Sequence, residues 1–154
     1  MKKIIILITA FLAISSCKND RLQLAPAASK IAGIQDDWTL NQVIQIDEIS
    51  QRELDVSQVY IGTSPMQINF KIHGTDTTYS VVNGTSANYL GNSGTWKFDD
   101  INYPTKLIIN HNGNDYQLPL IRTVREGDPN LEFRYTKVCS GKNVVSYKYI
   151  FKRS

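Results

Sequence analysis

The residues that could carry chemistry in this chain are two histidines, three pairs of adjacent acids and two cysteines. His73 and His111 fall near the ends of predicted strands, and we interpret them as surface or rim histidines because no second metal ligand is evident beside them. The acidic pairs stand at positions 36–37, 47–48 and 99–100. Adjacent side chains on a strand point to opposite faces, so none of these pairs forms a ready catalytic dyad.

Sequence motifs for catalysis are also absent. The chain has no Gly-x-Ser-x-Gly nucleophile elbow, no P-loop and no His-Glu-x-x-His zinc motif. We therefore expect no enzyme activity, no cofactor and no metal site. A hydrolase would need two carboxylates that face each other across a cleft, and it is the function that this sequence favours least.

The first seventeen residues read as an export signal. Met1-Lys2-Lys3 is basic, residues 4–14 are apolar except for Thr9, and Ser15-Ser16-Cys17 follows. An apolar run of about 11 residues spans roughly 16 Å as a helix, which is too short for a hydrocarbon core of about 30 Å. The end of the run resembles a bacterial lipobox, in which the signal peptidase cuts before a cysteine that carries the lipid. We expect a signal peptide at 1–16, lipid attachment at Cys17, and a bacterial outer-membrane location on either the periplasmic or the cell-surface face.

Cleavage before Cys17 changes the charge and the cysteine count. Loss of Lys2 and Lys3 lowers the basic residues from 17 to 15, against 14 acids. A near-neutral chain without a basic cluster argues against nucleic acid as a partner. Cys139 then has no cysteine partner, and we expect it to be buried in a strand as a small hydrophobic residue. Residues 17–32, which are polar at first and then rich in Ala with one proline, predict a flexible tether.

Beyond the tether, apolar and polar residues alternate in short runs. The clearest run is 66–73, where Met66, Ile68, Phe70 and Ile72 alternate with polar residues, as in a strand with one buried face. Segment 47–54 fits a short helix or an irregular loop, and 83–94 fits a loop. The remaining strands are predicted at 37–46, 57–62, 77–82, 95–99, 105–111, 116–124, 131–136 and 145–152.

These segments define one all-β domain over residues 33–154. About eight antiparallel strands joined by short turns, with no βαβ rhythm, favour an up-and-down barrel, and a β-sandwich is the alternative. Pro119 indicates an edge position or a bulge. The outward parity is polar, which favours a barrel in water over one that spans a membrane.

The layout resembles the lipocalin-like lipoproteins of Bacteroidota. The features shared are the lipobox at Cys17, the short tether, Trp38-Thr39-Leu40 on the first strand, the Gly-Thr-Trp-Lys-Phe segment at 94–98, and the aromatic last strand at 147–152. The resemblance implies a lipocalin-like up-and-down barrel with an apolar interior.

Aromatic side chains recur on the apolar parity of the strands. Core packing explains many of them, but three tyrosines on the last two strands carry more polar tips than a dry core of this size needs, which favours a cavity or a wet barrel end. The expected ligand-lining residues are Trp38, Phe70, Trp96, Tyr135, Tyr147 and Tyr149.

These features predict a lipid-anchored envelope lipoprotein that binds a small apolar or amphipathic ligand, or a segment of a partner. The alternative is a structural or accessory envelope lipoprotein that contacts other envelope proteins through its outer surface. Asp76-Thr77-Thr78 resembles the acceptor pattern for O-glycosylation in exported Bacteroidota proteins, so Thr77 is a candidate modification site.

Overall fold

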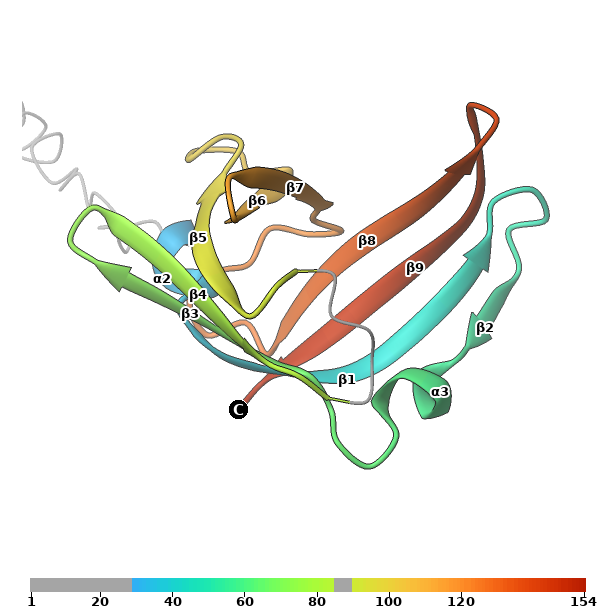
Figure 1. The fold of residues 1–154 in the computed structure, drawn as a ribbon, viewed down its shortest axis with the longest axis horizontal. Coiled ribbons are helices and arrows are strands. Elements are labelled where there is room, and N and C mark those ends of the chain that lie inside the picture. Colours follow the sequence, from blue (N-terminus) through green and yellow to red (C-terminus); the bar gives the residue numbers. More distant parts are fainter. Residues whose placement is uncertain (1–28, 85–89) are drawn as a thin grey trace, which may run out of the picture.

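The protein is built on one strongly curved antiparallel sheet (Figure 1). The computed structural model describes residues 29–84 and 90–154. Two five-residue helices accompany the sheet, α2 (Lys30–Ile34) and α3 (Ser57–Ile61). The strands are β1 (Asp36–Asp47), β2 (Glu53–Asp55), β3 (Gln67–His73), β4 (Asp76–Val82), β5 (Ser93–Phe98), β6 (Lys106–His111), β7 (Asn114–Pro119), β8 (Asn130–Cys139) and β9 (Lys142–Arg153).

The strand order makes this sheet a nearly closed up-and-down barrel. The order is β7-β6-β5-β4-β3-β1-β9-β8, and short β2 pairs with β1. Consecutive strands pair from β3 to β7, while β1 joins β3 to the last strand. At the β7–β8 junction, the described residues provide one isolated bridge, Leu120 to Phe133, and a hydrogen bond from Ile121 N–H to the Glu132 carbonyl at 3.0 Å. The prediction of an all-β, eight-stranded antiparallel barrel is confirmed.

Packed aromatic side chains occupy the middle of the barrel. Phe70 and Trp96 meet edge to face with their ring centroids 5.7 Å apart, and Phe133 and Phe151 lie 5.2 Å apart. All four are at most 2 % exposed. Aromatic pairs favour these tilted and edge-to-face geometries because the positive ring edge meets the negative face. The strand alternation read from the sequence therefore supplies the core.

A β-bulge changes the face of β1. Leu40 pairs with Phe151 and Gln42 pairs with Ile150, so the register shifts at the residue between them. An extra residue inverts the parity beyond it. As a result Val43 faces the core and is fully buried. In the sequence, Ile44 and Ile46 share the parity of Trp38 and Leu40, which predicts a common face. Beyond the bulge they instead lie on the face opposite to Val43, where Ile44 is half-buried and Ile46 is 8 % exposed.

Segment 57–62, predicted as a short strand, forms α3 instead. The Asp55 carboxylate accepts hydrogen bonds from the backbone N–H and the hydroxyl of Ser57, the first residue of α3, in an Asx-type turn just before the helix. Upstream, the segment predicted as a short helix or loop divides into a turn at 48–50 and β2. The side chains of α3 pack against the core through Tyr60 and Ile61.

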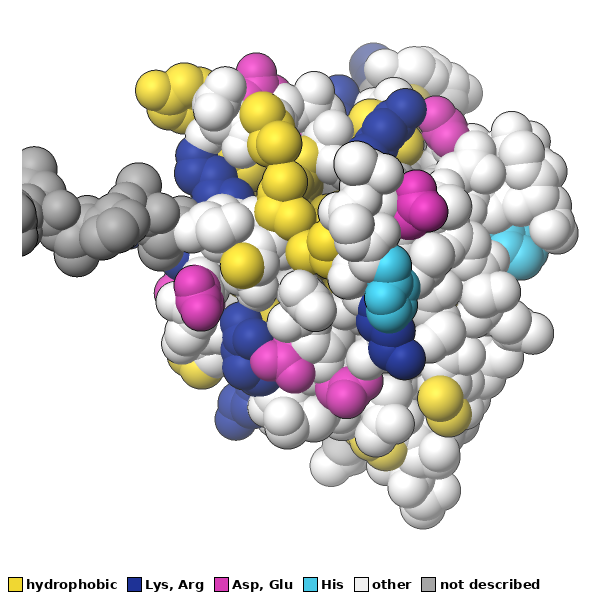
Figure 2. All heavy atoms as spheres, turned by 90° about the vertical axis from the view of Figure 1, so that its left-hand side faces the viewer, with side chains coloured by type: hydrophobic (Ala, Val, Ile, Leu, Met, Phe, Trp, Pro, Cys, Tyr) yellow, Lys and Arg dark blue, Asp and Glu magenta, His cyan; other side chains and the backbone are white. Residues whose placement is uncertain are grey.

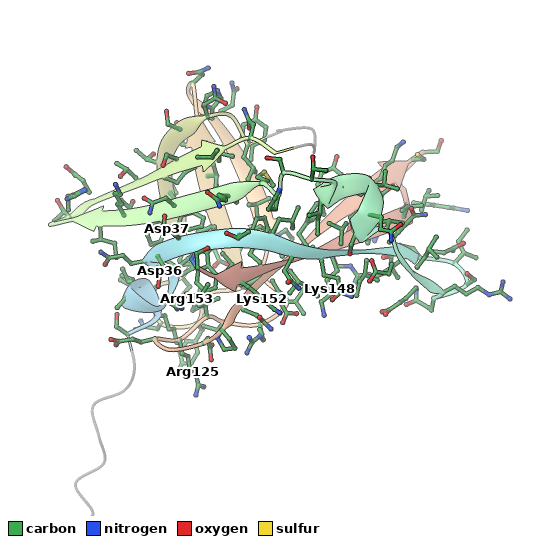
Figure 3. All side chains as sticks on the ribbon, turned by 90° about the horizontal axis from the view of Figure 1, so that it is seen from below. Asp36, Asp37, Arg125, Lys148, Lys152 and Arg153 are labelled. Atoms are coloured by element: carbon green, nitrogen blue, oxygen red, sulfur yellow. The ribbon has the colours of Figure 1, made fainter. Side chains whose placement is uncertain are left out.

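Arg153 fastens the end of the barrel where α2 lies (Figure 3). Its guanidinium donates to the Gly33 carbonyl at 2.9 Å and to the Asp128 carbonyl at 3.1 Å, and it pairs with the Asp36 carboxylate. It also lies 4.6 Å above the ring of Trp38. Partial desolvation raises the pKa of Asp36, but a backbone hydrogen bond and the guanidinium outweigh it and the pKa is lowered. One side chain thus joins α2, β1, β9 and the loop before β8.

At the other end of the barrel, three long strands project beyond the ring (Figure 1). β1 and β9 have 12 residues and β8 has 10, whereas β4 to β7 have six or seven each. Cys139 ends β8 in this projection and is exposed. The prediction of a buried Cys139 is therefore wrong, because β8 continues past the barrel wall into solvent.

The predicted signal peptide at 1–16, Cys17 and most of the tether lie outside the described residues. The last part of the predicted tether is described: Lys30 begins α2, and Ile31 packs against the core. Among the residues described, no helix has the length and apolar character needed to cross a membrane.

Candidate functional site at the β4–β5 opening

Strands β4 and β5 share a short ladder. Only Thr78, Tyr79 and Ser80 of β4 have paired residues on β5. Toward the β3–β4 turn, the two strands are joined by side-chain hydrogen bonds to the backbone. The Trp96 indole N–H donates to the Thr78 carbonyl at 3.0 Å, and the Thr77 hydroxyl donates to the Trp96 carbonyl. The two strands therefore separate beyond this point, and the barrel wall has an opening there.

A glycine on β5 allows the strands to pack tightly beside this opening. A Cβ on Gly94 would stand 2.0 Å from the Asn110 carbonyl oxygen and 2.9 Å from the Tyr79 ring. A real Cβ cannot be accommodated at these distances without a shift of the β6 backbone. Gly94 thus lets β5 lie close to β6 while it leaves β4.

Two hollows adjoin this opening. The larger one, which we call the outer groove, lies on the outside of the barrel. Its volume is about 480 Å³, within the range of roughly 300–1,000 Å³ typical of small-molecule sites. It is lined by Thr75, Asp76, Thr77, Thr78, Thr95, Trp96, Lys97, Ile108, Asn110 and Asp115. Most of these residues are polar, so the groove offers many hydrogen-bond donors and acceptors.

The register explains how the polar side chains of the outer groove come together. Thr78 pairs with Thr95, Thr95 with Asn110, and Asn110 with Asp115, which forms one row across β4, β5, β6 and β7. In β4, β5 and β6 these positions adjoin the buried residues Tyr79, Trp96 and Ile109, and they therefore face outward. The Asn110 amide donates to the Asp115 carboxylate at 2.6 Å, which fixes both side chains.

A smaller hollow, which we call the inner pocket, lies beside α2. Its volume is about 160 Å³. Apolar cavities of about 150 Å³ can hold one benzene-sized molecule, so this pocket suits the end of an alkyl chain or one apolar group. It is lined by Ile31, Thr77, Trp96, Lys97, Phe98 and Ile101.

Both hollows border the same segment of wall. Thr77, Trp96 and Lys97 line each of them. A polar groove therefore adjoins an apolar pocket across the strand opening. This arrangement has the chemistry to bind a molecule with a polar head and a short apolar part.

The predicted ligand-lining residues fall in three places. Trp96 lines both hollows at the opening. Trp38 and Phe70 are buried in the core, where the Trp38 indole N–H donates to the Ile34 carbonyl at 2.8 Å. The three tyrosines lie together at the end of the barrel that carries the projection, where Tyr135 pairs with Tyr147 across β8 and β9.

At this second end, α3 adds a tyrosine to the three on the sheet. The Tyr60 ring centroid lies 5.7 Å from that of Tyr147 and 6.3 Å from that of Tyr149. Burial, followed by the hydrogen bond with Tyr147, raises the pKa of Tyr60 to about 12. Exposure increases along the cluster, from 4 % at Tyr149 to 47 % at Tyr135. The polar tips thus meet one another and solvent at a wet barrel end.

Thr77, the predicted glycosylation site, lies at the opening. Its side chain is half-buried, and its hydroxyl is engaged with the Trp96 carbonyl. A glycan on this oxygen would displace that hydrogen bond and enter the groove. The prediction of modification at Thr77 has no direct support from this geometry.

Several residues of the opening were not singled out from the sequence. Ile31 was assigned to the tether, Lys97 and Asn110 read as ordinary polar strand residues, and Asp115 as part of a turn. The signal that could have found them is the Gly-Thr-Trp-Lys-Phe segment, where a glycine and a lysine flank the tryptophan. Within residues 29–84 and 90–154, no group of three or more His, Cys, Asp or Glu is arranged to hold a metal ion.

The fold and the opening together define a small antiparallel barrel with a groove and an apolar pocket at one place in its wall. No protein-family model matches the chain, and no curated protein matches it significantly.

Proposed function

We propose that this protein is a lipid-anchored envelope protein whose barrel binds a small amphipathic ligand at the β4–β5 opening. The observation that carries the proposal is that a polar groove and an apolar pocket share Thr77, Trp96 and Lys97. The polar head of the ligand lies in the outer groove, and its apolar part enters the inner pocket.

The core supports a site in the wall over one along the barrel axis. The aromatic side chains in the middle pack against one another, and the rings of Phe70 and Trp96 lie in contact. A ligand along the axis would have to displace these rings, whereas one at the opening fills existing space. The ligand therefore binds from the side of the barrel.

The charges in the outer groove favour particular head groups. The Lys97 ammonium suits a carboxylate or a phosphate, whereas the Asp76 and Asp115 carboxylates in the same lining oppose an anion and, with the threonines of the row, suit hydroxyl groups. An anionic or a polyhydroxylated head is thus compatible with the groove. The proposal includes both, and a pair of test ligands separates them.

The lipid anchor is the second part of the proposal. It is supported by the order of basic residues, apolar run and Ser-Ser-Cys at positions 1–17, and by the resemblance to lipocalin-like lipoproteins of Bacteroidota. In the source bacterium, a Cys17→Ala variant should move from the membrane fraction to the soluble fraction of the envelope. Retention of the variant with membranes would refute the anchor.

Ligand binding is tested with two single-chain amphiphiles, decanoate and dodecyl maltoside, each below the concentration at which it forms micelles. Binding is followed by thermal shift and by the fluorescence of the tryptophans, one of which lines both hollows. Thr95→Phe should fill part of the outer groove and weaken binding about tenfold. Ser80→Phe is the matched control, because Ser80 is also an exposed strand residue but does not line the groove.

Lys97→Glu separates the two head-group classes. It should weaken decanoate binding and leave dodecyl maltoside binding nearly unchanged if the lysine recognises an anion. The proposal is refuted if neither amphiphile shifts the melting temperature, or if Thr95→Phe and Ser80→Phe bind alike.

A second function, docking to an envelope protein, is favoured by the projecting end of the barrel. Ile49, Leu54, Val59 and Val138 expose between 57 % and 84 % of their surface there. Exposed apolar groups on one region can mark a protein interface. Crosslinking through Cys139 in intact cells tests this function, and capture of a partner that Val138→Glu abolishes would support it.

A further inference from the structure

Two large apolar side chains are displayed by one loop at the α2 end of the barrel. Ile101 is 61 % exposed and Tyr103 is 79 % exposed, and both follow β5 directly. Lys30 of α2 lies beside them, with its ammonium 4.9 Å from the centre of the Tyr103 ring. We propose that this surface, made of Lys30, Ile31, Ile101 and Tyr103, rests on the lipid bilayer.

The loop is held in place by two carboxylates. The Asp100 carboxylate accepts from the backbone N–H groups of Asn102 at 2.6 Å and Tyr103 at 2.8 Å. The Asp99 carboxylate accepts from the N–H groups of Thr105 and Lys106, both at 2.9 Å. These bonds fix the backbone on both sides of the apolar residues. Ile101 and Tyr103 are therefore presented by an ordered turn.

The composition of this surface matches the membrane interface. Tyrosine places an apolar ring and a polar hydroxyl at the level of the headgroups, an isoleucine enters the acyl boundary, and a lysine reaches up to phosphate. Figure 2 faces this end of the barrel and shows hydrophobic side chains gathered in a band, with charged side chains along its borders. If nothing covered this band, its apolar side chains would remain exposed to water, which is unfavourable for a contiguous apolar patch.

The position of the proposed lipid anchor argues that the bilayer, and not another protein, covers this surface. Residues 18–28 separate Cys17 from Ser29, and Ser29 caps α2 by accepting from the Ala32 N–H at 3.1 Å. Even fully extended, that length of chain reaches only about 40 Å. The described chain begins at α2, so the proposed tether joins the barrel at the same end that carries the exposed apolar loop, and this end is the part of the barrel nearest the anchor along the chain.

This contact rests on the proposed lipid anchor and adds a route for the ligand. Ile31 and Ile101 belong both to the surface and to the inner pocket. A pocket that borders the bilayer can receive the apolar part of an amphiphile directly from the membrane. Among small amphipathic molecules, the ligands expected for this site are therefore those that partition into lipid.

The test uses the full lipidated protein in vesicles of phosphatidylethanolamine with a minority of phosphatidylglycerol. An environment-sensitive dye is placed on Tyr103→Cys in a Cys139→Ser background. The same dye on native Cys139 is the control, because Cys139 is exposed and ends β8, and the projecting end of β8 lies opposite α2 in Figure 1. A nitroxide on the lipid just below the headgroups serves as quencher.

We expect quenching at position 103 to exceed quenching at Cys139 at least threefold, and Ile101→Asp to remove at least half of it. Equal quenching at the two positions, with the protein still bound to vesicles, would overturn the membrane contact and leave the anchor intact. Thr95→Phe, which blocks the ligand groove, should leave quenching unchanged. Loss of quenching in that variant would mean that bound ligand mediates the contact, and it would also overturn the proposal.

Discussion

Replacement of Arg153 by methionine tests how the α2 end of the barrel is held together. Methionine keeps most of the aliphatic stem but removes the guanidinium, so the change isolates its polar contacts. The two hydrogen bonds to the carbonyls of Gly33 and Asp128 contribute about 1 kcal/mol each. The position above Trp38 adds about 1 kcal/mol. The ion pair with Asp36 adds about 0.5 kcal/mol after allowance for its partial exposure to solvent.

The expected loss is thus about 3–4 kcal/mol of unfolding free energy, a large share of the roughly 5–15 kcal/mol that holds a domain folded. In a domain of this size it corresponds to a fall of about 10–15 °C in melting temperature. Urea unfolding followed by tryptophan fluorescence measures the change, because Trp38 and Trp96 are both buried. Arg153→Lys should recover only part of the loss, since an ammonium cannot reach two carbonyls and a carboxylate in the same geometry.

Arg134→Met is the matched control for this experiment. Arg134 also pairs with a carboxylate, that of Glu48, but it lies on the projection with 39 % of its side chain exposed. Its replacement should cost less than a third of the Arg153 loss. Equal losses in the two variants would show that Arg153 acts as an ordinary surface charge, and the role assigned to it would be refuted.

Three further predictions concern single side chains. Tyr60 should titrate with a pKa of about 12 in a phenolate absorbance titration, and Tyr147→Phe should lower that pKa. Because the pKa of Tyr60 is raised on folding, the contribution of Tyr60 to stability is present below pH 10 and is lost as the pH rises toward 12. The Thr105 hydroxyl and the Lys106 N–H lower the pKa of Asp99 below its ordinary 3.8, so its contribution is present above pH 4 and is lost in acid; Asp99→Asn should flatten the decline in melting temperature below pH 4. Cys139 should react with a thiol reagent in the native protein without loss of the fold, whereas a protected thiol would contradict its exposed position.

Strand alternation was enough to predict most of the barrel because one face of each strand is buried. Segment 66–73 forms β3 almost as expected, since every second residue is apolar and no glycine or proline interrupts the run. Segment 57–62 was misassigned, because six residues are too few for a helical period to appear. The turn in which Asp55 accepts hydrogen bonds from Ser57 lies just before this helix, and a turn of this kind is not visible in a strand or helix period.

The bulge in β1 shows a different limit. Gln42 interrupts the apolar face in the sequence, which indicates an irregularity but does not locate an inserted residue. The position of the inserted residue is seen only in the pairing with β9, where Phe151 and Ile150 are consecutive but their partners Leu40 and Gln42 are not. Register between strands distant in sequence is not encoded in either strand alone.

The candidate site was harder to predict than the fold, because it depends on where two strands separate. Trp96 was expected to line a ligand site on the ground that it lies on the apolar parity. In the structure, the same side chain donates to the Thr78 carbonyl and closes the ladder where β4 leaves β5. Nothing in the local sequence of β4 or β5 predicts where their ladder ends.

The filled interior and the wall opening follow from the same set of side chains. Phe70, Tyr79 and Trp96 pack together from three neighbouring strands, and Gly94 is the small residue that lets the Tyr79 ring lie against β5. A barrel whose middle is occupied in this way has free volume only at its ends and where strands diverge. A side chain at position 94 would push β5 from β6 and alter the outer groove, so the residue that completes the core also shapes the proposed binding site.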